Sequence, residues 1–243
     1  MGRSGLWSQI GYAAETTWST YLAPTRFLEF NDEDLKLNIE YIQSPSLRAG
    51  NRVLRSDREV ANKKGAGGSV THEVTDRSFG LLFKHALGTV AITTPGGGTA
   101  TRDHTHTLGD PYGLGLTCQV GRPDRDNTVQ PYSYLGCKIT EWELSQEIDA
   151  LLMWTHTLDA YDETTAQSLA AASFSTSSLF NYSQCSVTVA GSAFEPTKAS
   201  VKGSNGLNTE RYFLRSETRK KEPIASELVG LSGELAGEFE NLT

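Results

Sequence analysis

The chain has 243 residues and a formal net charge of −7, with 37% hydrophobic and 21% charged residues. This content can form a buried core, so a largely disordered protein is excluded, and the acidic balance argues against a general nucleic-acid binder. No run of 18 apolar residues is present, and the first 19 residues lack the apolar centre of a signal peptide, so we expect no membrane binding.

The predicted elements are mostly strands, because apolar and polar residues alternate along much of the chain. Apolar residues share one parity over residues 35–41 and again over residues 68–75, which is typical of half-buried strands. Further strands are predicted at residues 115–122, 132–147, 148–158, 183–190, 208–215 and 228–240. Clusters of Gly, Pro, Asn and Asp separate them. The sequence therefore predicts a mainly β, antiparallel fold in a single domain over residues 1–243.

One helix interrupts this pattern. Asp76 is a candidate N-cap and Gly88 a stop signal, which predicts a helix over residues 76–87. The apolar residues between them follow helical spacing: Phe79, Leu82, Phe83, Ala86 and Leu87. We expect this apolar stripe to flank the sheet by packing against one of its faces.

A basic segment follows the first strand, over residues 48–64. It holds six basic residues against two acidic ones, a net charge of +4. The basic residues are Arg48, Arg52, Arg55, Arg58, Lys63 and Lys64. The segment suits an arm that contacts an acidic patch on an identical neighbour, since the chain supplies both signs of charge. A nucleic-acid arm and a solvated loop without a partner are the alternatives.

Acidic residues gather later in the chain. No Lys or Arg lies between Lys138 and Lys198, a stretch that carries eight carboxylates. Within it, Glu141, Glu143, Glu147 and Asp149 share one parity with apolar residues between them, which indicates a strand with one acidic and one buried face. The strand predicted at 228–240 repeats this arrangement through Glu234, Glu238 and Glu240. A plain solvated sheet face would give the same pattern.

Few residues suggest catalysis or metal binding. His104 and His106 would lie about 7 Å apart on one face of a strand, a spacing that two metal ligands could use, but no third ligand stands out. The paired carboxylates at 141/143 and 147/149 fit glycosidase chemistry less well than a charged surface. The three cysteines are widely spaced and predict neither a disulfide framework nor a zinc site, which suits a reducing compartment. We therefore predict a protein that is not an enzyme and uses no cofactor.

Several segments together resemble the tail tube proteins of long-tailed bacteriophages. The resemblance covers roughly the first 90 residues, with a further match late in the chain. Its motifs are Gln9-Ile10-Gly11-Tyr12, Glu15-Thr16-Thr17-Trp18, Phe27-Leu28-Glu29-Phe30, Arg48-Ala49-Gly50, Arg55-Ser56-Asp57-Arg58, Gly80-Leu81-Leu82-Phe83-Lys84-His85 and Gly230-Leu231-Ser232-Gly233-Glu234-Leu235. Trp18 stands where the family pattern has Tyr, and the family leads us to expect further residues after the last strand.

The resemblance implies a β-sandwich or barrel whose strands pool into one inner barrel when six copies close a ring. Rings would stack into a hollow tube that conducts the genome and holds the tape-measure protein during assembly. Residues 1–26 would form an N-terminal arm, and residues 44–67 a long basic loop between subunits. Our candidates for the lumen wall are Glu141, Glu143, Glu147, Asp149, Glu234 and Glu238. Such a wall would guide DNA without binding it.

The expected partners are further copies of this chain, the tape-measure protein and the tail-tip and terminator proteins. The expected location is the virion tail, assembled in the host cytoplasm. Two other interpretations stay open at this point. One is another ring-forming virion protein, such as a tail terminator, and the other is a metal-dependent hydrolase built on His104 and His106.

Overall fold

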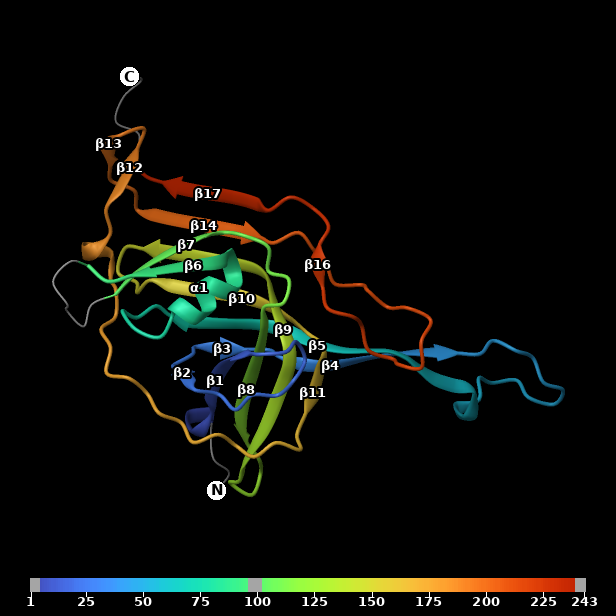
Figure 1. Ribbon diagram of the computed structural model, residues 1–243. Coiled ribbons are helices and arrows are strands. Elements are labelled where there is room, and N and C mark those ends of the chain that lie inside the picture. Colours follow the sequence, from blue (N-terminus) through green and yellow to red (C-terminus); the bar gives the residue numbers. More distant parts are fainter. Residues whose placement is uncertain (1–4, 96–101, 239–243) are drawn as a thin grey trace.

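The computed structural model describes residues 5–95 and 102–238. Within them, eleven strands form one antiparallel sheet that folds over into two layers (Figure 1). The first layer contains β1 (Gln9–Glu15), β2 (Arg26–Leu28), β8 (Gly115–Pro123), β11 (Asp162–Thr164) and the first half of β9 (Val129–Glu147). The second layer contains β3 (Asp32–Glu33), β4 (Lys36–Gln43), β5 (Glu59–Glu73), β10 (Met153–Ala160), β14 (Lys198–Ser204), β17 (Gly230–Ala236) and the rest of β9. The mainly β prediction is confirmed, and the described chain forms a sandwich without closing a barrel.

The long strand β9 passes from one layer to the other. It pairs with β8 as far as Cys137 and with β10 from Lys138 onward. Gly136 adopts φ +61° at this crossing, a backbone conformation that favours glycine. A Cβ there would also lie 3.0 Å from Trp18, so the N-terminal segment packs closely against the bend.

The core lies between the two layers and contains a histidine pair. The Tyr12 hydroxyl lies 2.9 Å from Nε2 of His72, whose Nδ1 lies 2.7 Å from the carbonyl oxygen of Glu29. The ring of His156 stacks on that of His72 at 5.6 Å between centroids. Burial lowers the pKa of His72 to about 4 and that of His156 well below its usual value, so both imidazoles are neutral at pH 7.

The helix α1 (Gly80–Leu87) is shorter than predicted. Asp76 does not cap it, because the Asp76 carboxylate accepts a hydrogen bond from the Ser178 backbone at 2.8 Å instead. The helix begins after Phe79 and ends at Gly88, as the glycine predicts. Its buried residues and Phe83 pack against the core side of the second layer, where Phe83 meets Trp154 at 5.1 Å between ring centroids.

The N-terminal region differs from the expected arm over residues 1–26. Gln9–Glu15 is the strand β1, which is paired with β2 and β8 on its two sides and buries Ile10 and Tyr12 completely. These residues belong to the sandwich core, because alternation places their side chains between the layers.

Several predicted strands have different bounds. The strand predicted at 148–158 begins only at Met153, because residues 148–150 form a turn in which Asp149 adopts φ +60°. The strand predicted at 208–215 is wrong beyond Asn208, since ion pairs rather than a sheet hold the segment that follows. Residues 183–190 contain only the short strand β12 (Val187–Val189), which follows the 3₁₀ turn Tyr182–Gln184.

The remaining strands form small hairpins and pairs at the edges of the sandwich. They are β6 (Gly88–Thr93) with β7 (Asp103–Leu108), β12 with β13 (Ser192–Phe194), and β15 (Leu207–Asn208) with β16 (Ile224–Ala225). Two further 3₁₀ turns cover Gly5–Trp7 and Ser56–Arg58.

Candidate functional surfaces

One side of the second layer, which we call the polar face, carries almost only polar side chains. Residues that lie opposite each other in antiparallel strands point to the same side, so the register defines this face. It comprises Asp32 of β3, Ser69, Thr71 and Glu73 of β5, Met153, Thr155 and Thr157 of β10, Glu141, Glu143, Ser145 and Glu147 of β9, Lys198, Ser200, Lys202 and Ser204 of β14, and Ser232 and Glu234 of β17.

The polar face is acidic, but its acidic row is partly neutralised. Lys202 lies 3.2 Å from Glu143 and Lys198 lies 2.8 Å from Glu147, each across the β9–β14 pair. Glu141 and Glu234 make no ion pair within the described chain. The face therefore carries six carboxylates against two ammonium groups, a net charge of −4. Sequence reasoning missed the two lysines, because they lie 51 and 59 residues from their partners and only the strand register brings them together.

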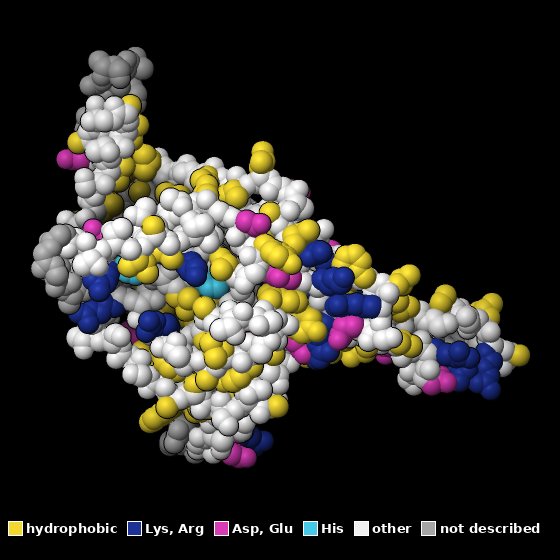
Figure 2. Space-filling view, viewed as in Figure 1, with side chains coloured by type: hydrophobic (Ala, Val, Ile, Leu, Met, Phe, Trp, Pro, Cys, Tyr) yellow, Lys and Arg dark blue, Asp and Glu magenta, His cyan; other side chains and the backbone are white. Residues whose placement is uncertain are grey.

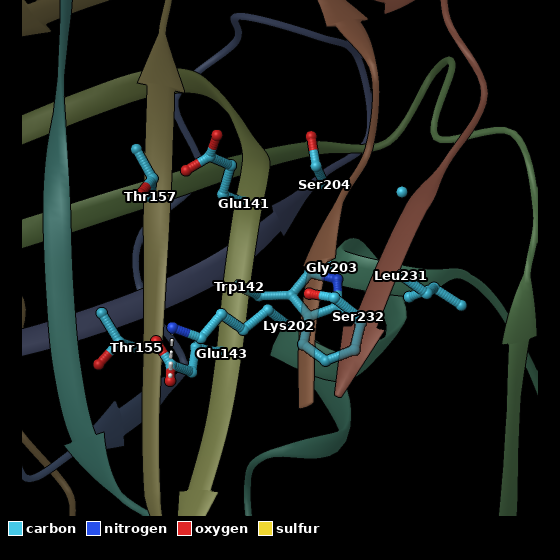
Figure 3. A pocket seen from close by; sticks show the side chains of 11 residues that line it. Glu141, Trp142, Glu143, Thr155, Thr157, Lys202, Gly203, Ser204, Leu231 and Ser232 are labelled. Atoms are coloured by element: carbon cyan, nitrogen blue, oxygen red, sulfur yellow. Dashed lines mark ion pairs between the residues drawn. The ribbon is translucent and has the colours of Figure 1, made fainter. Parts of the chain in front are cut away.

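A shallow hollow lies in the middle of the polar face (Figure 3). Its volume is about 490 Å³, and Glu141, Glu143, Thr155, Thr157 and Lys202 point their side chains around it. Trp142 and Leu231 also line this hollow, so apolar surface lies among its hydroxyl and charged groups.

Two predicted lumen residues lie off this face. Asp149 lies in the turn after β9, because its positive φ ends the alternation that would have placed it in the acidic row. Glu238 lies beyond the end of β17 and is exposed. The acidic row on β9 therefore ends at Glu147.

The reverse side of the same sheet is apolar and only partly covered. Trp142 stacks on Trp154 at 5.4 Å between ring centroids, and its indole leaves no room for a Cβ at Gly203 on β14. Val201, Leu231 and Leu235 on the same side are 47%, 55% and 45% exposed.

The second layer has an unpaired edge on each side. In the described part of the chain β17 pairs only with β14 on one side, and β3 and β4 each pair only with β5 on the other. The edge at β17 therefore combines open backbone groups with an exposed apolar side, which natural proteins seldom leave uncovered.

The basic segment forms a projecting hairpin made of β4, β5 and the tip between them, residues 44–58 (Figures 1 and 2). Arg48, Arg52 and Arg58 are exposed at the tip, whereas Arg55 pairs with Asp57. The expected loop over residues 44–67 is shorter than predicted, because residues 59–67 belong to β5.

Lys63 and Lys64 are accordingly strand residues rather than loop residues. Lys63 lies 2.7 Å from Glu210, and Lys64 lies 2.8 Å from Asp162. Both ammonium groups are thus bound within the chain, which leaves the arginines of the tip as the basic groups directed outward.

A segment that sequence reasoning missed, residues 209–222, is tied to the base of the hairpin by ion pairs. Lys220 pairs with Asp159, and Arg219 lies 2.6 Å from Asp162. Lys138 is buried and lies 2.6 Å from Glu222, and burial lowers the pKa of its ammonium group. The run of charged residues in this segment was the available signal, but each partner lies on a distant strand.

His104 and His106 lie together on β7, with 6.2 Å between ring centroids. The described residues hold no group of three His, Cys, Asp or Glu side chains placed to bind a metal ion. The third ligand that the hydrolase interpretation requires is therefore not found among them.

Among the described residues, no helix has both the length and the apolar composition that crossing a membrane requires.

No curated protein matches the chain. A family model described as phage tail tube protein matches residues 5–243. Because this match spans nearly the whole chain, the protein belongs to the phage tail tube protein family.

Proposed function

We propose that six copies of this chain close into a ring with the polar face turned inward, and that stacked rings form the tail tube that conducts the genome. During assembly the same channel would hold the tape-measure protein. The observation that carries the proposal is a single sheet with an open polar face on one side and an uncovered apolar stripe on the other. Such a sheet is suited to line a water-filled channel while its reverse packs on protein.

The charges of the polar face support passage of DNA without binding. DNA carries one negative charge per about 1.7 Å of helix axis, and proteins retain it through unpaired Lys and Arg. Both lysines of this face are paired with Glu143 and Glu147, so a phosphate meets no free cation there. The net negative charge repels the phosphates, and the hydroxyl groups between the charges keep a layer of water.

The free edges of the second layer support ring closure. β17 ends the sheet on one side, and β3 and β4 end it on the other, so the contact of one copy's β17 with the opposite edge of the next copy is head-to-tail. When the rotation between neighbouring copies closes the ring, the sheets of all copies join into one barrel and no sheet edge stays exposed.

Substitutions on β17 test this arrangement. Leu231→Asp and Leu235→Asp place a charge on the apolar stripe, where both side chains are about half exposed in the single chain, so the subunit still folds. We expect these variants to lose tube formation in negative-stain electron microscopy and to sediment as monomers. Ser232→Asp is the matched control, since it adds the same charge on the same strand but on the polar face. It should still form tubes.

Tubes of normal length and diameter from both leucine variants would contradict ring closure through β17. Loss of tubes in Ser232→Asp alone would place the polar face, and not the apolar stripe, at the subunit contact.

A further inference from the structure

We propose that the tip of the β4–β5 hairpin, residues 44–58, docks into an apolar groove at the far end of a second copy and thereby joins successive rings. This inference rests on the proposed tube and names the receiving surface for the basic hairpin. The receiving surface, which we call the end groove, lies between the β12–β13 hairpin, the preceding 3₁₀ turn and the adjoining ends of β9 and β14.

The hairpin tip combines exposed apolar side chains with positive charge. Leu47, Val53 and Leu54 are 99%, 76% and 71% exposed. The tip holds four arginines and one aspartate, a net charge of +3, and only Arg55 is paired in the described chain. Large exposed apolar side chains among basic ones are typical of a surface that is buried in an assembly.

The end groove has the complementary properties. Its volume is about 540 Å³, and its apolar or sulfur-containing lining residues are Ile148, Tyr182, Cys185, Val187, Phe194 and Pro196. Carboxylates surround it: Glu147 and Glu195 line the groove, and Asp149 lies in the adjoining turn. Lys198 neutralises Glu147. The groove therefore presents an apolar floor with a net negative rim, which fits the apolar and basic tip in both respects.

The two surfaces lie at opposite ends of the same sheet, so one copy cannot join its own tip to its own groove. The tip precedes Glu59 at the start of β5, whereas the register places Glu73, at the end of that strand, beside Met153 and the end of β9. Fifteen residues of strand at about 3.3 Å each separate these ends by about 45 Å. Figure 1 shows the tip and the β12–β13 hairpin far apart on opposite sides of the molecule.

A contact between such opposite ends is heterologous, with different surfaces on the two copies. Repeated along the strand direction it does not close on itself, and it generates an open stack. The same chain would thus use its sheet edges to close each ring and its two sheet ends to add the next ring.

Cross-linking at a natural cysteine tests the docking. Cys185 is exposed and lines the end groove, whereas Cys118 and Cys137 are buried in the core. In assembled tubes of a Leu54→Cys variant, a short bismaleimide should link the tip of one copy to Cys185 of the next. Denaturing gels should then show a ladder at multiples of the 26.5 kDa subunit.

Two controls make the ladder specific. Replacing Cys185 with serine in the Leu54→Cys background should abolish it, and Leu214→Cys, an exposed position on the 209–222 segment, should give none. Where Leu54→Cys blocks assembly, Leu47→Cys and Val53→Cys repeat the test from the same tip.

The outcomes separate the docking from the tube itself. Tubes that give no ladder from any tip position would overturn docking in the end groove and leave the tube role intact. Cross-linked dimers without higher multiples would indicate a reciprocal contact and overturn the open stack. A chain that forms no tubes, with or without the substitutions, would overturn the proposed function and the docking together.

Discussion

At the scale of single residues, Glu15 explains why the N-terminal motif matters to the whole fold. Its carboxylate accepts hydrogen bonds from the backbone of Ser19 and Gly136 and from the hydroxyl of Thr117, at 2.7, 2.8 and 3.0 Å. Trp18 donates to the Gly136 carbonyl at 3.1 Å. The Glu-Thr-Thr-Trp motif therefore fixes the point where β9 changes layer. The sequence showed the motif, but not its partner 121 residues away.

The buried histidine pair makes the subunit sensitive to acid. His72 and His156 are neutral in the fold and ordinary bases in the unfolded chain, so unfolding takes up protons below about pH 6.5. Stability is thus fully present above that pH. It falls as the pH drops toward 4, by about 1.4 kcal/mol per pH unit for each imidazole.

Replacing one imidazole tests this sensitivity. Neither ring nitrogen of His156 has a hydrogen-bond partner in the described chain, so His156→Phe leaves no polar group unpaired. We expect the unfolding free energy of this variant to vary less steeply between pH 6.5 and 4 than that of the wild type. Urea titrations of dilute protein across this range measure the slope. An unchanged slope for His156→Phe would refute the assignment.

At the scale of elements, the β14–β17 pair is joined to the sandwich through a tryptophan and a glycine. Gly203 lies opposite Trp142, and the indole fills the space that a side chain would need. Trp142 in turn stacks on Trp154 of β10. This contact sets how closely the outer strands approach the core, and so it sets the position of the edge that closes the ring.

Gly203→Ala should therefore destabilise the subunit. A Cβ at this position would lie well inside van der Waals contact with the indole, and overpacking of this kind costs about 1–3 kcal/mol. Chemical denaturation followed by tryptophan fluorescence gives the change. Gly230→Ala is the matched control on the paired strand, where the nearest atom to a new Cβ is 3.8 Å away. Equal stability of the two variants would exclude the packing role.

Local patterns predicted the strands better than the connections between them. Alternation found β8 and β9, because both faces of those strands have a fixed environment. The helix start was wrong because Asp76 binds another segment, and the acidic row was incomplete because Lys198 and Lys202 come from a distant strand. A cross-strand pair depends on register, which no single strand encodes.

At the scale of the whole molecule, charge is sorted along three surfaces. The hairpin tip is basic, the end groove is bordered by carboxylates, and the polar face is acidic with its lysines paired. Although the whole chain has a net charge of −7, its two ends carry charges of opposite sign, and these ends would meet in a stack.

Charge reversal on the polar face tests whether it guides DNA. Glu141→Lys together with Glu234→Lys changes the net charge of this face from −4 to zero and adds two unpaired cations. Tubes should still form, and particles that carry the double variant should eject DNA several-fold more slowly, most of all at low salt. Asp126→Lys with Glu29→Lys, two exposed positions outside this face, is the control. Wild-type ejection rates from the Glu141/Glu234 variant would remove the guiding role.

A cryo-electron microscopy reconstruction of tubes grown from this chain tests the proposed ring most directly. We expect sixfold rings around a channel, with Glu141, Glu143 and Ser232 on the channel wall and Leu231 and Leu235 covered by the neighbouring copy. A tube whose channel is lined by the β1–β8 layer, or one that leaves β17 unpaired, would contradict it.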